Sequence, residues 1–315
     1  MSGSSIFQLN HSPELTDPVL LIALEGWIDA GMAAANAMSL LLGRTDSEPV
    51  AEFNIGRLLD HRARRPIMHL VNGLITSLSW PSIELKAAAD SSGNDLLLLA
   101  GAEPDFEWES FCDAIVDFAH TFGCRMAVTL GAYPAAVAHT RETSLSVTTS
   151  SIDLSSSLHG YARGTLDVPS GVHSVLDVAL NKTGIPTLGL WAQVPHYVSA
   201  MNYPAGSVAL IEGLKDVAGL NIEHSELVSD ATATRLRLDE LVAENPQHRT
   251  MVEQLEELMN QGVGGPDVAP TIGFDRIPSA DELAAEVQEF LMRRPDEPGS
   301  GEPGQGDPAG PESGS

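Results

Sequence analysis

Five short apolar runs, separated by longer amphipathic segments, constrain the fold of this chain more than any other feature of its sequence. Continuous apolar runs of this length are typical of strands covered on both faces, as in the centre of a parallel sheet. Strands that alternate with helices imply right-handed crossovers and a largely parallel sheet. The sequence therefore predicts an α/β domain whose strands include the runs Val19–Leu24, Ile67–Val71, Asp95–Ala100, Met126–Leu130 and Thr187–Ala192.

The segment 104–123, PDFEWESFCDAIVDFAHTFG, has the clearest helical pattern between these runs. Apolar side chains recur there at helical spacing, Asp105 is placed to cap the start, and Gly123 is placed to end the helix. The residues predicted to share its buried face are Trp108, Phe111, Cys112, Ile115, Ala119 and Phe122.

The pattern changes at Glu223, after which the chain is predicted to be helical. Two helices should meet at Asn245–Pro246, and a Gly/Pro-rich linker, 262–273, precedes a third helix capped by Ser279. Apolar stripes on such helices indicate core packing in most cases, with partner binding as the alternative. The predicted organisation is an N-terminal segment 1–17, an α/β domain 18–222, a helical extension 223–294 and a disordered acidic tail 295–315.

The charge of the chain excludes several function classes. Seventeen basic residues against 43 acidic ones give a formal net charge of −26, which argues against nucleic-acid and anionic-membrane binding. The longest apolar stretch, Val19–Leu24, is too short to cross a bilayer, and no signal peptide is evident. Cys112 and Cys124 predict neither a disulfide framework nor a metal cluster, so we expect a cytoplasmic protein without metal or cofactor.

Polar residues follow three of the apolar runs, in the segments EGWIDAG, GAYPAAVAHTR and VPHYVSAMNYP. Because parallel strands end at the same edge of a sheet, these loops should share one rim. Arg141 could clamp an anion or pair with Glu25, and a histidine could act as acid or base. The alternative is that the polar groups cap helices and satisfy loop backbone, as Asp29 would at the helix 30–42. The candidate site is Glu25, Asp29, His139, Thr140, Arg141, His196 and Tyr197.

The common catalytic signatures are missing from the sequence. Gly26 and Gly31 have the spacing of a phosphate-binding loop, but Met32 and Ala33 replace its lysine and hydroxyl residue. The patterns Gly-x-Gly-x-x-Gly, Gly-x-Ser-x-Gly and His-Glu-x-x-His do not occur. No complete catalytic motif is therefore identified.

Five blocks, in this order, resemble bacterial members of the proteasome assembly chaperone 2 family: EGWIDAGMAA, AGAEPDFEWESF, LGAYPAAVAHTR, LWAQVPHYVSAMNYP and RIPSADELAAEVQEFL. The resemblance covers about residues 18 to 294. It implies a phosphorylase/hydrolase-like α/β/α sandwich, as in purine nucleoside phosphorylases, with an added C-terminal helical segment. Eukaryotic relatives are non-enzymatic chaperones that hold proteasome α subunits during ring assembly.

Two departures from the family limit what the resemblance implies. The chain ends in a Gly/Pro/Ser tail rather than in the short motif that the eukaryotic chaperone inserts into the proteasome ring. Bacterial relatives often carry an ATP-grasp superfamily label, but the lysines of this chain, Lys86, Lys182 and Lys215, lie outside any Gly-rich loop. We therefore do not expect an ATP-dependent ligase.

Two functions stay open at this point. The first is a non-catalytic protein-binding or proteasome-assembly-chaperone-like protein, with proteasome subunits as candidate partners. The second is a small-molecule hydrolase or phosphorylase-like enzyme, or a sensor, for a nucleoside- or phosphate-type ligand. Similar sandwiches commonly associate through loops at the edge of the sheet, so we expect a homo-oligomer, with a trimer favoured.

Overall fold

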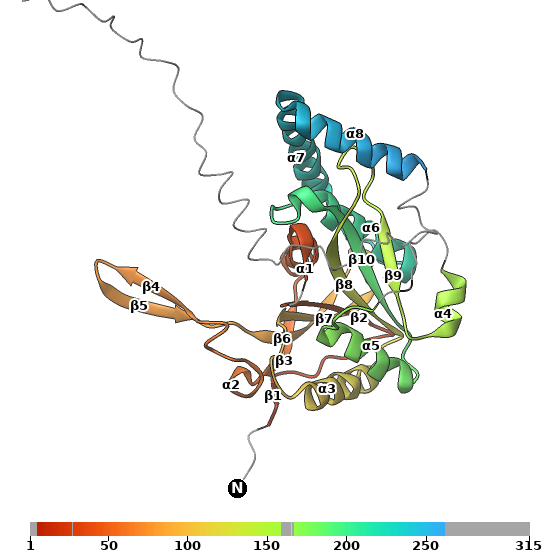
Figure 1. The fold of residues 1–315 in the computed structure, drawn as a ribbon. Coiled ribbons are helices and arrows are strands. Elements are labelled where there is room, and N and C mark those ends of the chain that lie inside the picture. The colour runs from red at the N-terminus through yellow and green to blue at the C-terminus, as the bar shows by residue number, and fades with distance from the viewer. Residues whose placement is uncertain (1–4, 27, 159–164, 166, 262–315) are drawn as a thin grey trace, which may run out of the picture. The chain divides into compact units, whose positions relative to one another are not determined.

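The computed structural model describes residues 5–26, 28–158, 165 and 167–261 and folds them into one eight-stranded sheet, a separate two-stranded sheet and flanking helices (Figure 1). The strands are β1 Phe7–Leu9, β2 Val19–Glu25, β3 Glu48–Phe53, β4 Ile67–Val71, β5 Leu74–Ser79, β6 Ile83–Ala89, β7 Asp95–Ala102, β8 Met126–Ala135, β9 Leu145–Thr148 and β10 Thr187–Pro195. The α-helices are α1 Ala33–Arg44, α2 Ile55–Leu58, α3 Trp108–Thr121, α4 Ile152–Ser157, α5 Val172–Lys182, α6 Pro204–Ala218, α7 Ser225–Glu244 and α8 Pro246–Asn260. Two short 3-10 helices are η1 Ala30–Met32 and η2 His196–Val198.

The large sheet has a parallel centre and antiparallel margins. Its strand order is β1-β3-β6-β7-β2-β8-β10-β9, in which β7, β2, β8 and β10 run parallel to their neighbours in this group. The strands outside this group pair antiparallel. Four of the predicted apolar runs form these four central strands, so the predicted parallel core of the sheet is confirmed.

Helices cover both faces of the sheet, which makes an α/β/α sandwich (Figure 1). Val19 and Leu21 of β2 pack in a core with α1 and α6, while Leu20 and Ile22 pack on the other face with α3 and α5. Alternate residues of one strand point to opposite faces, so a strand buried on both sides must be apolar throughout. The continuous apolar runs follow from this requirement.

The run 67–71 is a strand, but the prediction that it is covered on both faces was wrong. It forms β4, which pairs only with β5 in a hairpin whose residues are all exposed. Asn72 and Gly73 make the turn with φ values of 51° and 79°. Two successive residues with positive φ are what an Asn-Gly hairpin turn requires. The dipeptide Asn72–Gly73 was thus the sequence signal that separates this run from the buried strands.

Helix α3 follows the predicted pattern: its residues Phe111, Cys112 and Ile115 are buried, and Gly123 adopts the left-handed conformation just after the helix. The prediction that Asp105 caps this helix was wrong. Its carboxylate instead accepts hydrogen bonds from the backbone N–H of Asp60 and from the guanidinium of Arg64. Asp105 therefore fixes the loop before α3 to the chain that follows α2.

Helices α7 and α8 meet at the predicted break, where the Asn245 side chain accepts a hydrogen bond from the N–H of Gln247. Leu238 is the buried residue of α7, while Val252 and Leu255 are those of α8. The expected helix from Ser279 and the tail 295–315 lie outside the described residues. None of the helices in the described part of the chain is long and apolar enough to cross a membrane.

Candidate functional site

The candidate rim lies where the parallel strands β2, β8 and β10 end. Strand β8 continues into the loop 136–141, and β10 continues into η2, which carries His196 and Tyr197. The two strands are paired in register up to Pro195 and Ala135, so the prediction that the loop begins at Gly131 was wrong, and residues 131–135 belong to β8. This register brings their following loops together, as the sequence predicted for adjacent parallel strands.

His139 is the centre of a hydrogen-bonded group that joins both loops to α7. Its side chain is buried, and the Tyr197 hydroxyl oxygen accepts its backbone N–H at 2.8 Å. The same hydroxyl lies 2.6 Å from His139 Nδ1, and His139 Nε2 lies 3.2 Å from Asp239 Oδ1. A hydroxyl that accepts from an N–H is free to donate to Nδ1, which leaves the proton of neutral His139 on Nε2 to donate to Asp239.

Burial sets the protonation states in this group. It lowers the pKa of His139, although the Asp239 carboxylate opposes this, and it raises the pKa of Tyr197 to about 12. Neutral His139 and a protonated Tyr197 hydroxyl are the forms that the hydrogen-bond pattern requires. Both ring nitrogens of His139 are therefore occupied by groups of the same chain.

The next two residues of the loop bind α8. The Thr140 hydroxyl donates to the Glu256 carboxylate, and Arg141 Nη2 donates to Asn260 Oδ1 at 2.9 Å. Beneath them, Ala138 packs in a small apolar cluster with Val252 and Leu255. The segment 138–141 thus attaches the helical pair to the end of β8.

Glu25 and Asp29 belong to the turn between β2 and α1 and serve its backbone. The carbonyl oxygen of Glu25 accepts the N–H of Glu103 at 2.7 Å. The Asp29 carboxylate accepts the N–H groups of Ala34 and Ala35 at 2.8 and 2.9 Å, which caps α1 as the alternative interpretation predicted. Burial raises the pKa of Asp29, and the nearby Glu25 charge adds to this effect.

The seven candidate residues therefore do not converge on one point. His139, Thr140, Arg141 and Tyr197 contact each other or the helices α7 and α8. His196 is exposed at the start of η2, where its ring meets the Tyr197 ring edge-on with a centroid distance of 5.4 Å, whereas Glu25 and Asp29 lie in the turn before α1. The pairing of Arg141 with Glu25 is not among the hydrogen bonds and ion pairs of the described residues. What the sequence missed are the partners Asp239, Glu256 and Asn260, which no motif marks.

A second polar group, also missed from the sequence, fills the end of the sheet beside β2. Strand β2 pairs with β8 only as far as Ile22, and beyond that point His173 Nε2 accepts the N–H of Leu24 at 3.2 Å. Glu103 Oε1 accepts the N–H of Val172 at 2.6 Å, at the first residue of α5. Burial lowers the pKa of His173 to about 4, so this histidine is neutral at pH 7.

Gly26 is the sequence signal for this second group. A Cβ added to it would lie 2.6 Å from the Glu103 side chain and 2.8 Å from Arg64 Nη2. Only glycine lets Glu103 and Arg64 approach the end of β2 this closely. The arrangement ties β2, β7 and α5 together and is structural in character.

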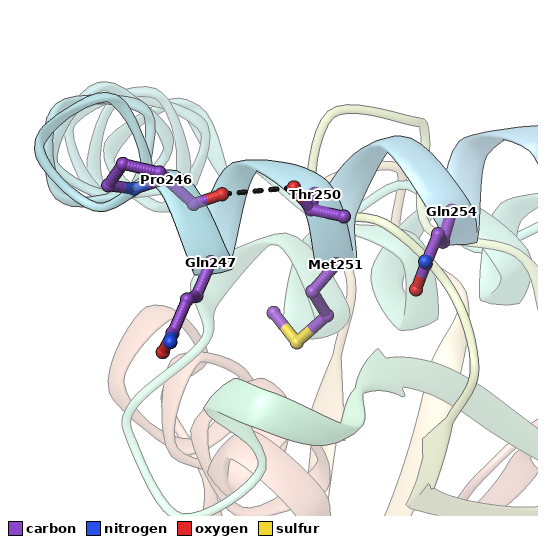
Figure 2. A pocket seen from close by; sticks show the side chains of 5 residues that line it. All are labelled: Pro246, Gln247, Thr250, Met251 and Gln254. Atoms are coloured by element: carbon purple, nitrogen blue, oxygen red, sulfur yellow. Dashed lines mark hydrogen bonds between the residues drawn. The ribbon is translucent and has the colours of Figure 1, made fainter.

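Two cavities lie elsewhere on the described surface. One, on α8, has a volume of about 360 Å³. Figure 2 shows its lining residues, which all come from this one helix, and the hydrogen bond that Thr250 donates to the carbonyl of Pro246 at 3.1 Å. The second, of about 590 Å³, is the α3–α5 groove, lined by apolar Val116, Val175, Val178 and Ala179 and by charged Asp113 and Lys182. Neither is lined by a candidate residue.

Neither a metal-binding cluster nor a reactive thiol is present among the residues that the structure describes. No cluster of three or more His, Cys, Asp or Glu side chains is placed to hold a metal ion there. Cys112 and Cys124 are free and buried, and burial raises the pKa of each thiol to about 12. Both cysteines are therefore protonated core residues rather than nucleophiles.

Comparison with known proteins places the chain among relatives of similar sequence and fold. A protein of unknown function from Corynebacterium glutamicum is 31% identical, with a TM-score of 0.78 over 82% of this chain and 98% of that one. A Mycobacterium tuberculosis protein of unknown function is 33% identical, with a TM-score of 0.76 over 82% and 91%. A proteasome-assembly chaperone homologue from Mycobacterium tuberculosis is 30% identical, with a TM-score of 0.68 over 74% and 99%.

No curated protein matches the chain. The model of the PAC2 family matches residues 23–242, which run from the first central strand into α7. This match covers well over half of the chain and includes β7, β8, β10 and the end of β2. The chain therefore belongs to the PAC2 family.

Proposed function

We propose that this chain is a non-catalytic protein-binding protein that acts as a proteasome-assembly chaperone does, with proteasome subunits as its candidate partners. One observation carries the proposal: the polar loop 139–141 is occupied by α7 and α8 of the same chain. A general acid or base needs a ring nitrogen that faces the substrate. Both nitrogens of His139 are already bonded to Tyr197 and Asp239.

The outer surface of the helical pair supports a role in protein binding. Leu236 and Leu241 of α7 and Leu258 of α8 are exposed large apolar side chains on helices that are otherwise rich in charge. Amphipathic helices that keep apolar side chains in solvent are a recurrent mode of peptide and protein recognition. The relative from Mycobacterium tuberculosis that is named as a proteasome-assembly chaperone homologue supports the choice of partner.

The alternative, a hydrolase or phosphorylase-like enzyme or a sensor, requires Glu25, Arg141 and His196 to face one open cavity. The side-chain hydrogen bond of Arg141 goes to Asn260 of α8, and no hydrogen bond or ion pair joins Arg141 to Glu25 among the described residues. The observations therefore favour the protein-binding function.

We also propose that the protein is a homo-oligomer, with a trimer favoured. A net charge of −26 opposes association at low ionic strength. Any contact between copies must therefore bury apolar surface, and added salt should strengthen it.

An affinity pull-down from the native cell tests the partner. We expect the wild-type chain to recover proteasome subunits, identified by mass spectrometry. The double variant Leu236→Ser, Leu258→Ser should reduce this recovery at least tenfold. Ile152→Ser is the matched control, because Ile152 is an exposed apolar residue on α4. Failure to recover proteasome subunits with the wild type would refute the assignment. A metabolite-binding screen of the wild type beside Arg141→Ala tests the enzyme alternative in parallel.

A further inference from the structure

The hairpin β4–β5, residues 67–79, is called the arm here, and it is the most apolar exposed element that the structure describes. It projects from the body of the protein (Figure 1). Its large apolar side chains are exposed from 47% at Met68 to 69% at Leu74. These residues are Ile67, Met68, Leu70, Val71, Leu74, Ile75 and Leu78. We propose that the arm docks in the α3–α5 groove of a second copy of this chain, an inference that rests on the homo-oligomer proposed above.

The register of the arm places apolar side chains on both of its faces. Met68 lies opposite Leu78, and Leu70 lies opposite Ile75, so these four residues share one face. Val71 and Leu74 lie opposite each other on the other face, with His69 hydrogen bonded to Ser79. A strand pair with one polar and one apolar face could lie on a flat surface. This arm instead fits a groove that covers more than one side.

The exposed area of the arm is too large for a free monomer surface. At these exposures a large aliphatic side chain presents on the order of 100 Å², so the arm presents roughly 700 Å² of apolar side chain. The largest apolar patch of a typical monomer is about 300–600 Å², and one partner contributes about 800 Å² to a standard interface. A lone two-stranded hairpin is also marginally stable in water. The arm therefore needs a partner surface of standard size.

The charges of the arm and of the groove are complementary. Residues 66–82 contain no Asp, Glu, Lys or Arg, and Arg62, Arg64 and Arg65 precede them. Arg64 pairs with Asp105, whereas Arg62 and Arg65 are exposed and have no ion pair among the described residues. A partner surface should therefore be an apolar strip beside acidic residues.

The α3–α5 groove of the same chain has this character. Its apolar floor contains Val116, Val175 and Val178, and Val178 is exposed. Asp113 and Lys182 line it, and Glu109 and Asp117 add two exposed carboxylates on α3. The six residues of β5 span about 20 Å, and the lining of the groove runs along α5 from Ser174 to Lys182, about 14 Å, so the groove can cover most of the length of one strand of the arm.

Two further considerations favour a second copy over a foreign protein. An arm this apolar is an aggregation hazard whenever it is uncovered. A second copy is present wherever the arm is, whereas another protein is not. The contact joins two different surfaces, so each copy gives one arm and receives one, and head-to-tail contacts form a ring where the rotation between copies closes. A trimer is one such ring.

Light scattering after size-exclusion chromatography tests the inference with two variants. Leu70→Ser with Ile75→Ser damages the arm, and Val178→Glu places a charge in the groove. We expect the wild type and the control Ile152→Ser to be oligomers, and each damaged variant to be a monomer with its dissociation constant raised at least tenfold. A mixture of the two damaged variants should form a one-to-one pair, because one retains the arm and the other retains the groove.

A monomeric wild type, an oligomeric arm variant or a mixture that does not pair would each overturn the inference. Hydrogen exchange of the wild type adds a readout that needs no substitution. Protection of the amides of residues 67–79 should rise with protein concentration, and exchange independent of concentration contradicts docking between copies. Arm-dependent sedimentation with phosphatidylglycerol vesicles, without self-association, would replace the second copy by a membrane. Loss of proteasome-subunit recovery with self-association intact would refute the proposed partner alone.

Discussion

Replacing Tyr197 by phenylalanine tests the group of hydrogen bonds that joins the loop 136–141 to the rest of the protein. The change removes one oxygen atom and keeps the ring that packs beside Ala138. That oxygen accepts the buried N–H of His139 at 2.8 Å and lies 2.6 Å from His139 Nδ1. His139 is 2% exposed, so water cannot take the place of the hydroxyl without a rearrangement of the loop.

The expected loss follows from the groups left without a partner. An ordinary net hydrogen bond contributes about 0.5–1.5 kcal/mol, whereas leaving a buried donor unsatisfied costs about 1–3 kcal/mol. Tyr197→Phe leaves the N–H of His139 unsatisfied and removes the donor to Nδ1, so we expect a loss of about 2–3 kcal/mol in the free energy of unfolding. Because Asp239 then holds His139 alone, the attachment of α7 should weaken as well.

Tyr133→Phe is the matched control. The Tyr133 hydroxyl lies 2.6 Å from Ser146 Oγ, and Ser146 Oγ also accepts from Gln193 Nε2 at 3.1 Å. Ser146 thus keeps a partner after the substitution, and we expect a loss of about 1 kcal/mol.

Urea denaturation followed by tryptophan fluorescence and by circular dichroism measures both losses, with unchanged m-values as the condition for comparing them. Hydrogen exchange across residues 225–260 should show faster opening in Tyr197→Phe alone. Equal losses for the two variants would show that the hydroxyl does not hold the loop in solution, and the structural argument would fail.

Three further changes test other parts of the structure. Gly26→Ala should lower the free energy of unfolding by about 1–3 kcal/mol and with it the melting temperature, because the added Cβ would lie 2.6 Å from Glu103. Gly43→Ala is the control in α1: its Cβ would have nothing within 4 Å, so this change should raise the melting temperature. A fall for both variants would contradict the first argument. Burial lowers the pKa of His173 from 6.5 to about 4, so at acid pH the unfolded chain binds a proton at this residue before the folded chain does. The difference in the free energy of unfolding between the wild type and His173→Gln should therefore be largest above pH 6.5 and shrink toward pH 4. Parallel pH profiles in urea denaturation would refute this. Asp29→Ala removes the two carboxylate bonds to the start of α1 and should cost about 1 kcal/mol in thermal melts, and an unchanged melting temperature would argue against the cap.

The sequence alone predicted the centre of the fold because a strand that is buried on both faces has a run of apolar residues, which is visible in the sequence itself. The strands β2, β7, β8 and β10 are apolar at most of their buried positions, with Thr129, Thr187 and Gln193 as buried polar exceptions, and this pattern is visible without any partner. The break at Asn245–Pro246 and the cap at Asp29 are equally local, since each depends on residues a few positions away.

The arm marks the limit of such patterns. The run 67–71 has the composition of a buried strand, yet all of it is exposed. Asn72–Gly73 indicates a hairpin, but no local feature tells whether another surface covers that hairpin. Exposure depends on where the rest of the chain lies, and the tertiary structure alone decides it.

The candidate site shows the same division in its polar contacts. The sequence placed His139, Thr140 and Arg141 on one loop after a strand, and they do follow β8, although that strand runs five residues further than predicted. Their partners Asp239, Glu256 and Asn260 lie 100, 116 and 119 residues further along the chain. A hydrogen bond needs its two atoms within a few tenths of an ångström of the right distance, so only the packing of α7 and α8 on the sheet determines which polar groups meet.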